Sequence, residues 1–213
     1  TGRALRQSVI KESPKTFAFL SEFKRNLEDR PIHRLWGKGN PFYALYDIGD
    51  YTFAPYKVMW KYVAGKISGK GEFSVVVIPP KMDKWLGSKT IIPNEKLMLV
   101  PFRDQNEAHY VASVLNSSLV RLVVASYTIE TAISTHVLKN VRVPKFDSEN
   151  AIHKKLSELS KEAHKLAAVD DKEGLSKVEI EMDRLVSELY DLTDDELREV
   201  KESLAMLLGH EFE

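Results

Sequence analysis

The spacing of apolar residues changes along the chain, and this change restricts the architecture more than any other feature. Between 42 and 101, short runs of β-branched and aromatic residues are separated by glycine, proline and asparagine, which is typical of strands. After Asp147, apolar residues recur every three or four positions, as they do along one face of a helix. The pattern predicts an α+β fold, in which a mixed, strand-rich domain with a buried helix is followed by an antiparallel helical C-terminal appendage. We expect strands over 43–48, 51–54, 57–64, 73–79 and 96–100, and a short one near 141–143.

Residues with capping chemistry mark where helices begin. A serine before proline, or an Asp or Thr three residues before Glu, satisfies the free N–H groups of a first helical turn. Three pairs fit this description: Ser13 with Pro14, Asp104 with Glu107, and Thr193 with Glu196. They predict a helix over 14–29, a largely buried helix over 105–125 and a last helix after Thr193. We expect an N-terminal helix and basic linker over 1–41, the strand-rich domain over 42–146 and an acidic, coiled-coil-like appendage over 147–213.

Charge also divides the chain near position 145. Residues 1–145 hold 22 Lys and Arg against 12 Asp and Glu, a net charge of +10, whereas residues 146–213 hold 9 against 19, a net charge of −10. A basic segment attracts polyanions, and an acidic one is repelled by them. The two halves are therefore expected to do different jobs. An acidic helical segment is also an ordinary solvated surface, so charge alone leaves both interpretations open.

The absence of cysteine excludes disulfides, cysteine-based zinc sites and thiol nucleophiles. The sequence begins with Thr1 and contains neither a charged-then-apolar leader nor an unbroken apolar run of about 18 residues. We therefore expect a cytoplasmic fragment of a larger protein, with no membrane partner.

Motifs that would carry catalysis are incomplete. Asn40-Pro41-Phe42-Tyr43 is similar to the Asn-Pro-Pro-aromatic motif that holds the target amine in amino-group DNA methyltransferases, but its second proline is missing. Glu22-Phe23-Lys24 has the spacing of a nuclease motif, but no aspartate precedes it. The six histidines lack metal-ligand spacing, and we expect His153 and His164 to face solvent. The sequence thus predicts no catalytic residue, no metal and no cofactor within this chain.

Basic residues on expected loops are the candidates for binding DNA. A loop cation can reach a backbone phosphate oxygen, and six residues fit this description: Arg34, Lys38, Lys66, Lys70, Lys84 and Lys89. Lys61, Thr135 and His136 are candidates for reading bases, with Ser134 and Thr131 behind them. Ordinary solvated side chains remain the alternative for the lysines.

The strand expected over 57–64 has two different faces. Val58, Trp60 and Tyr62 share one face by the two-residue period of a strand, and Lys57, Met59 and Lys61 share the other. We expect the first face in the core and the second toward solvent or a ligand. Trp36 and Trp85 lie in expected loops, where packing and base stacking are both open.

Several short segments, in their order and spacing, resemble the TaqI-like C-terminal specificity domain of adenine-N6 DNA methyltransferases, including fused type II restriction-modification enzymes. Together they lie within about residues 10–165. The segments are 43–49, Tyr51-Thr52-Phe53, 55–60, 108–110, Leu115-Asn116-Ser117-Ser118-Leu119, 133–138 and Val143-Pro144-Lys145-Phe146.

The resemblance implies a target-recognition domain that lies across a DNA cleft from a Rossmann-like catalytic domain. That upstream methyltransferase domain would bind S-adenosylmethionine and flip an adenine, whereas this chain would read base edges of double-stranded DNA and hold phosphates. The appendage resembles helical spacers of restriction specificity proteins, which pack on a partner domain or subunit. A protein-interaction module and an RNA-binding module remain alternatives. The first leaves the basic half unexplained, and the second lacks an RNP-like strand pattern and a KH loop.

Overall fold

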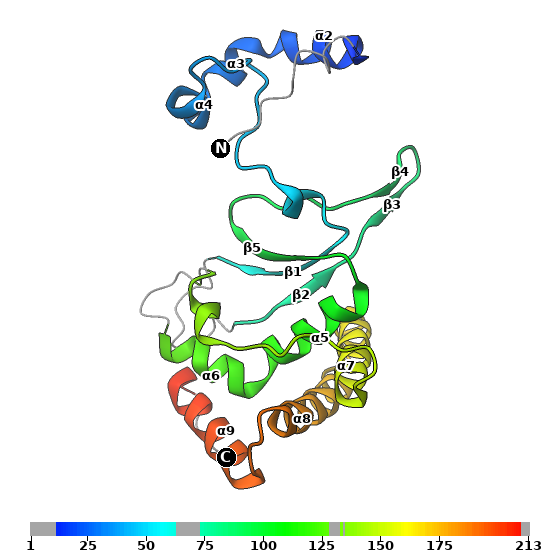
Figure 1. Cartoon of the computed structure of the whole chain (residues 1–213), viewed down its shortest axis with the longest axis vertical. Helices are drawn as coiled ribbons and strands as arrows, with labels where there is room; N and C mark the ends of the chain where they lie inside the picture. The colour runs from blue at the N-terminus through cyan, green and yellow to red at the C-terminus, as the bar shows by residue number, and fades with distance from the viewer. Residues whose placement is uncertain (1–11, 63–72, 128–132, 134, 210–213) are drawn as a thin grey trace. The chain divides into compact units, whose positions relative to one another are not determined.

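The computed structural model describes residues 12–62, 73–127, 133 and 135–209, and the chain divides into two compact units between Thr52 and Phe53 (Figure 1). The described residues of the first unit form three short helices, α2 (Pro14–Glu22), α3 (Lys24–Glu28) and α4 (Pro31–Trp36). The single helix expected over 14–29 is wrong in one respect, because the backbone leaves helical geometry at Phe23 and begins a new helix there.

The strands expected over 43–48 and 51–54 do not form. The guanidinium of Arg30 donates hydrogen bonds to the carbonyl oxygens of Phe42 at 3.1 Å and Ala44 at 2.9 Å. A side chain thus occupies acceptors that a neighbouring strand would otherwise use, and the backbone follows an irregular path. Next comes a short 3-10 helix, η1 (Asp50–Phe53), at the junction of the two units.

The second unit is built on a three-stranded antiparallel sheet in the order β2 (Val76–Ile78), β1 (Tyr56–Lys61), β5 (Leu97–Phe102). In the central strand, Lys57 lies opposite Ile78 on one side and Pro101 on the other. These strands confirm three of the expected strands with different bounds: β2 is shorter than expected, and β5 extends two residues further, to Phe102. A separate two-stranded hairpin, β3 (Lys81–Asp83) and β4 (Gly87–Lys89), occupies a segment that was expected to be a loop.

Both faces of β1 are buried from Lys57 to Trp60, contrary to the expectation that one face meets solvent, and only Lys61 at the end of the strand is exposed. Val58 and Trp60 lie in the core, as expected, whereas Tyr62, expected on the same face, is exposed. On the other face, Met59 is buried and the Lys57 residue is only 1% exposed, while its ammonium donates to the Ala54 carbonyl oxygen at 2.7 Å. Burial lowers the pKa of Lys57, because removing an ammonium from water disfavours its charged form. Lys57 is thus part of the structure rather than of a solvent-facing binding surface.

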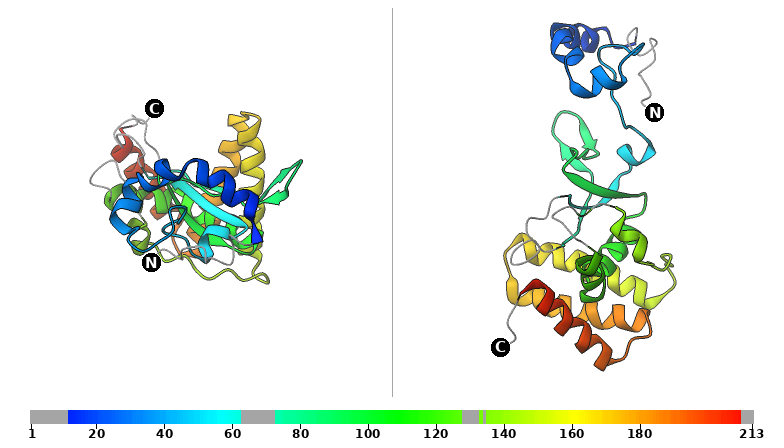
Figure 2. Two further views of the ribbon diagram at one scale, coloured as in Figure 1. Left: turned by 90° about the horizontal axis from the view of Figure 1, so that it is seen from above. Right: turned by 90° about the vertical axis from the view of Figure 1, so that its left-hand side faces the viewer.

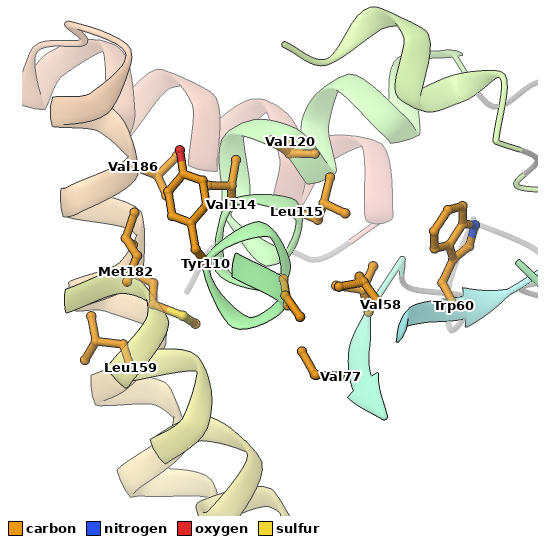
Figure 3. Close-up of a cluster of buried hydrophobic side chains, with 14 of the residues drawn as sticks. Val58, Trp60, Val77, Tyr110, Val114, Leu115, Val120, Leu159, Met182 and Val186 are labelled. Carbon is orange, nitrogen blue, oxygen red and sulfur yellow. The ribbon is translucent and has the colours of Figure 1, made fainter. Parts of the chain in front are cut away.

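Five helices cover the sheet and each other: α5 (Gln105–Asn116), α6 (Ser118–Tyr127), α7 (Ala151–Ala168), α8 (Lys172–Leu189) and α9 (Asp194–Leu208). α5 contacts β1, β2 and β5, and α7 packs against α5. Side chains from the sheet and from four of these helices form one apolar core, part of which Figure 3 shows. A 3-10 helix, η2 (Val137–Asn140), precedes α7, and the strand expected near 141–143 does not form.

The helices after 147 form as expected, but they belong to the same compact unit as the sheet. α7 packs on α5, α8 on α7 and α9 on α6, so the core is continuous across the boundary expected at 146. The division that the structure does show lies at Thr52, rather than at 41. The α+β class is confirmed, with the C-terminal helices packed against each other.

Two of the three predicted caps form, whereas Ser13 precedes α2 without making a side-chain hydrogen bond to its first turn. The Asp104 side chain accepts a hydrogen bond from the Glu107 N–H at 2.8 Å, and Thr193 with Glu196 forms a reciprocal capping box. The helix expected over 105–125 is instead two helices that bend by 64° at Ser117. Asp183 in α8 accepts hydrogen bonds from the N–H and the hydroxyl of Ser118, at 2.7 and 2.8 Å, and thereby caps the new helix.

Candidate nucleic-acid interface

The β3–β4 hairpin extends beyond the three-stranded sheet and away from α7 to α9 (Figures 1 and 2). Its turn is held by Asp83, whose carboxylate accepts hydrogen bonds from the N–H groups of Trp85 and Leu86, each at 2.8 Å. Gly87 follows with a φ of 70°, a left-handed conformation that glycine adopts at little cost. Local turn chemistry therefore shapes this hairpin and holds its tip outward.

The hairpin contains three lysines and one acidic residue. The register places Lys81 directly opposite Lys89, and Lys84 lies in the turn. Like charges on opposing positions of an antiparallel ribbon destabilise it. None of the three lysines forms an ion pair with any other residue that the structure describes. The lone acid, Asp83, is engaged by the turn. An anionic ligand would relieve the repulsion between Lys81 and Lys89.

Large apolar side chains are exposed at the same hairpin. Trp85 is 80% exposed, Met82 74% and Leu86 67%. The Lys84 ammonium lies 4.8 Å from the centre of the Trp85 ring, a cation–π contact. Apolar surface of this size is normally buried or reserved for contact with another molecule. The hairpin thus combines positive charge with an exposed aromatic tip.

A second group of candidate residues gathers at the far end of β1. Ile133 donates its N–H to the Tyr62 carbonyl oxygen at 2.7 Å and accepts a hydrogen bond from the Trp60 indole at 2.9 Å. These bonds bring the segment that carries Thr135 and His136, both exposed, toward the strand end that carries Lys61, also exposed. Lys66, Lys70, Thr131 and Ser134 lie outside the described residues.

The two groups lie at opposite ends of the sheet. The hairpin that carries Lys84 and Lys89 follows Ile78, which is opposite Lys57, whereas Lys61 is opposite Leu97 at the other end of β1. The structure therefore does not gather all the predicted residues of the second unit into one patch. Lys81 was not among the predicted residues. It lies two residues before Asp83, ahead of a turn, and this alternating spacing is the pattern that could have placed it on a strand of the hairpin.

The candidates of the first unit differ from each other. Arg34 forms an exposed ion pair with Asp29 at 3.2 Å, so a carboxylate already balances its charge. Lys38 is exposed in the turn after α4 and pairs with no described residue. None of the residues in α2, α3 and α4 is buried, and Leu35 and Trp36 are among the exposed apolar side chains.

Side chains from the helices occupy the outer edge of β2. The Asn116 amide accepts from the Val75 N–H and donates to the Val75 carbonyl oxygen, each at 2.9 Å, and His164 accepts from the Val77 N–H at 2.9 Å. A cavity of about 470 Å³ adjoins this edge, and its lining includes Asn116, His164 and Arg121. Asn116 and His164 are thus engaged in structural contacts, and we assign no chemistry to the cavity.

The histidines expected to face solvent are structural. His153 is buried, its Nδ1 accepts from the Asp147 N–H at 3.0 Å, and its Nε2 lies 3.4 Å from the Tyr110 hydroxyl. His164 accepts a hydrogen bond from the backbone of β2, as described above. Within the described ranges no three His, Asp or Glu side chains are grouped as metal ligands would be.

No single helix among the described residues is long and apolar enough to cross a membrane; α5 and α6 meet those criteria of length and composition only as a bent pair. Comparisons of the chain with protein-family models, with curated proteins and with solved structures gave no match.

Proposed function

We propose that this chain is a sequence-specific DNA-recognition module of a restriction-modification type adenine-N6 DNA methyltransferase, whose catalytic domain is a separate part of the enzyme. The observation that carries the DNA-binding part is the β3–β4 hairpin, where Lys81 and Lys89 oppose each other without a described counter-charge. A two-stranded ribbon fits the major groove of B-DNA, where base edges are distinguishable. Lysines along such a ribbon are suited to hold the phosphates that flank the groove.

The distribution of charge supports the same proposal. The net charge of +10 over residues 1–145 favours a polyanion, and the net charge of −10 over residues 146–213 disfavours one. Helices α7 to α9 carry the acidic part, and the hairpin points away from them (Figure 1). Duplex DNA would approach from the side of the hairpin, with the acidic helices turned away.

The methyltransferase context rests on the resemblance of the segments between 43 and 146, and it needs its own test. Methyl transfer would take place in the separate catalytic domain, which would bind S-adenosylmethionine. The reading frame upstream of the codon for Thr1 should encode an Asn-Pro-Pro-aromatic motif and a glycine-rich methyl-donor site. A reading frame without them would contradict the proposal that this chain belongs to a methyltransferase. The DNA-binding proposal would then be judged from the binding measurements alone.

A protein-interaction module is the second candidate, and the first unit favours it. Its described helices, α2 to α4, bury no residue, while Phe19, Leu35 and Trp36 are exposed. This apolar surface fits another protein domain or subunit better than a phosphate backbone. Both candidates could hold together, since a recognition module must also attach to its catalytic domain.

Binding to different nucleic acids separates the candidates. Affinity should be measured by fluorescence anisotropy for random-sequence duplex DNA, single-stranded DNA and duplex RNA, at about 50 mM and about 200 mM salt. We expect duplex DNA to bind best and to weaken steeply with salt. Absence of duplex binding at the lower salt would contradict the proposal, and tighter RNA binding would favour the RNA-binding alternative. Repeated selection from a randomised duplex pool should enrich one motif, and a pool that stays random would overturn sequence specificity.

A further inference from the structure

The β3–β4 hairpin presents the ring of Trp85 to solvent, and among the described residues only the Lys84 ammonium makes an aromatic or cation–π contact with it. The Trp85 side chain is 80% exposed and belongs to a turn that Asp83 holds with two hydrogen bonds. The neighbouring Leu86 is 67% exposed. A turn held by the Asp83 carboxylate keeps the indole outside the core, so the exposure of Trp85 follows from the geometry of the hairpin.

The positive charge near Trp85 limits which class of molecule can contact its ring. The Lys84 ammonium lies 4.8 Å from the ring centre, and Lys81 and Lys89 face each other on the same hairpin, two register positions before the turn. An apolar protein surface would have to bury these ammonium groups or find carboxylates for them. A nucleic acid offers phosphates to the lysines and flat, apolar base faces to the ring in one ligand.

We infer that Trp85 stacks on a nucleobase when the hairpin binds DNA, while Lys81, Lys84 and Lys89 hold the adjacent phosphates. This inference rests on the proposed DNA-binding function and adds the mode of contact. Stacking needs a base face that is not covered by a neighbouring base. The hairpin should therefore prefer DNA in which a base is unpaired or a base step opens easily.

Three variants separate stacking from simple apolar contact. Trp85→Phe keeps an aromatic face, Trp85→Leu keeps apolar bulk without one, and Trp85→Ala removes both. Affinity for a random-sequence duplex with one unpaired base should fall roughly 5- to 150-fold in Trp85→Ala and Trp85→Leu, and much less in Trp85→Phe. The salt dependence of binding should stay as in the wild type, because a stacked ring releases no counterions. Circular dichroism would verify that each variant is folded.

Tryptophan fluorescence gives a direct reading of the contact. In a Trp36→Phe background the remaining indoles are Trp85 and Trp60, and Trp60 is buried. We expect emission to be quenched on addition of the duplex with an unpaired base, and less by the fully paired duplex. The quenching should vanish in the Trp36→Phe/Trp85→Phe double variant.

The outcomes distinguish this inference from the proposed function. If duplex DNA binds with a steep salt dependence but Trp85 emission does not change, or if Trp85→Leu binds as well as the wild type, stacking is overturned and DNA binding stands. If no DNA binds at about 50 mM salt, both are overturned.

Discussion

Asn116 binds the backbone of Val75 through both polar atoms of its side-chain amide, accepting from the N–H and donating to the carbonyl oxygen, each at 2.9 Å. Another strand would make the same two bonds. His164 continues the pattern with the Val77 N–H. The edge of β2 is thus attached to α5 and α7 by side chains, and this attachment joins the sheet to the helices that share its core.

Replacing Asn116 tests this attachment. Asn116→Ala leaves the N–H and the carbonyl oxygen of Val75 without their partner, and we expect the free energy of unfolding to fall by about 2 kcal/mol or more. Urea unfolding followed by circular dichroism measures the change. Asn26→Ala, at an exposed position of α3, is the control and should stay within about 0.5 kcal/mol. Equal stability of the two variants would show that the edge contact contributes nothing.

His109 makes the stability depend on pH. Its Nδ1 lies 2.9 Å from the Ser160 hydroxyl, and burial, with nearby His164 and Lys161, lowers the pKa of His109 from 6.5 to about 4. The unfolded chain therefore binds this proton more readily than the fold does. The stabilisation is fully present above about pH 6.5 and is lost as the pH falls toward 4, by about 3 kcal/mol in all.

The variant His109→Gln isolates this effect, because it cannot take up the proton. Urea unfolding should be measured from about pH 7 to about pH 4 for both proteins. We expect the free energy of unfolding to fall more steeply with decreasing pH in the wild type than in the variant. Parallel curves would mean that His109 does not titrate differently on folding.

Asp183 ties three helices together. Its carboxylate accepts from the N–H and the hydroxyl of Ser118 at the start of α6, and it pairs with Lys201 of α9 at 3.0 Å. Asp183→Ala leaves the partly buried N–H and hydroxyl of Ser118 without their acceptor and Lys201 without its partner, so we expect a loss of about 3 kcal/mol of unfolding free energy. Asp195→Ala, whose exposed carboxylate pairs with Arg198, should lose less than about 1 kcal/mol. A loss no greater than that of the control would refute the role of Asp183.

Gly87 controls the shape of the hairpin without touching its charge. Its φ of 70° is costly for a residue with a Cβ, although no heavy atom lies within 4 Å of where the Cβ would be. Gly87→Ala should speed amide exchange in the hairpin roughly 5- to 30-fold, whereas Gly87→Asn should change it less, because asparagine tolerates this conformation. Hydrogen exchange by mass spectrometry measures both. Equal exchange in both variants would show that backbone conformation does not limit the hairpin.

Local chemistry made part of the fold predictable. The caps at Asp104 and Thr193 depend on side chains within three residues of the helix start, and both form as expected. The break at Ser117 has a local part, since the Ser117 hydroxyl accepts from the Val120 N–H at 3.4 Å. The acceptor for the Ser118 N–H is Asp183, which lies far along the chain, and nothing near Ser118 in the sequence predicts that contact. The strand expected over 43–48 failed for a similar reason, since Arg30 takes the carbonyl oxygens of Phe42 and Ala44.

The candidate interface was predictable in composition but not in arrangement. Lys84 and Lys89 were chosen because they lie in a basic, glycine-containing segment, and they do lie on an exposed element. The opposition of Lys81 and Lys89 depends on the register of the hairpin, which rests on the Asp83 turn and the left-handed Gly87. Amino-acid composition does not determine which residues pair across two strands, so Lys81 was not predicted as a candidate.

The salt dependence of duplex binding tests the central claim most directly. Two triple variants should be compared with the wild type: Lys81→Gln/Lys84→Gln/Lys89→Gln on the hairpin, and Lys154→Gln/Lys165→Gln/Lys172→Gln on α7 and α8, which removes the same charge from the acidic helices. We expect the slope of log affinity against log salt to flatten by about 0.9 for each lost phosphate contact in the hairpin variant and to stay unchanged in the other. Equal slopes in all three proteins would contradict the assignment of the hairpin as the DNA-binding element.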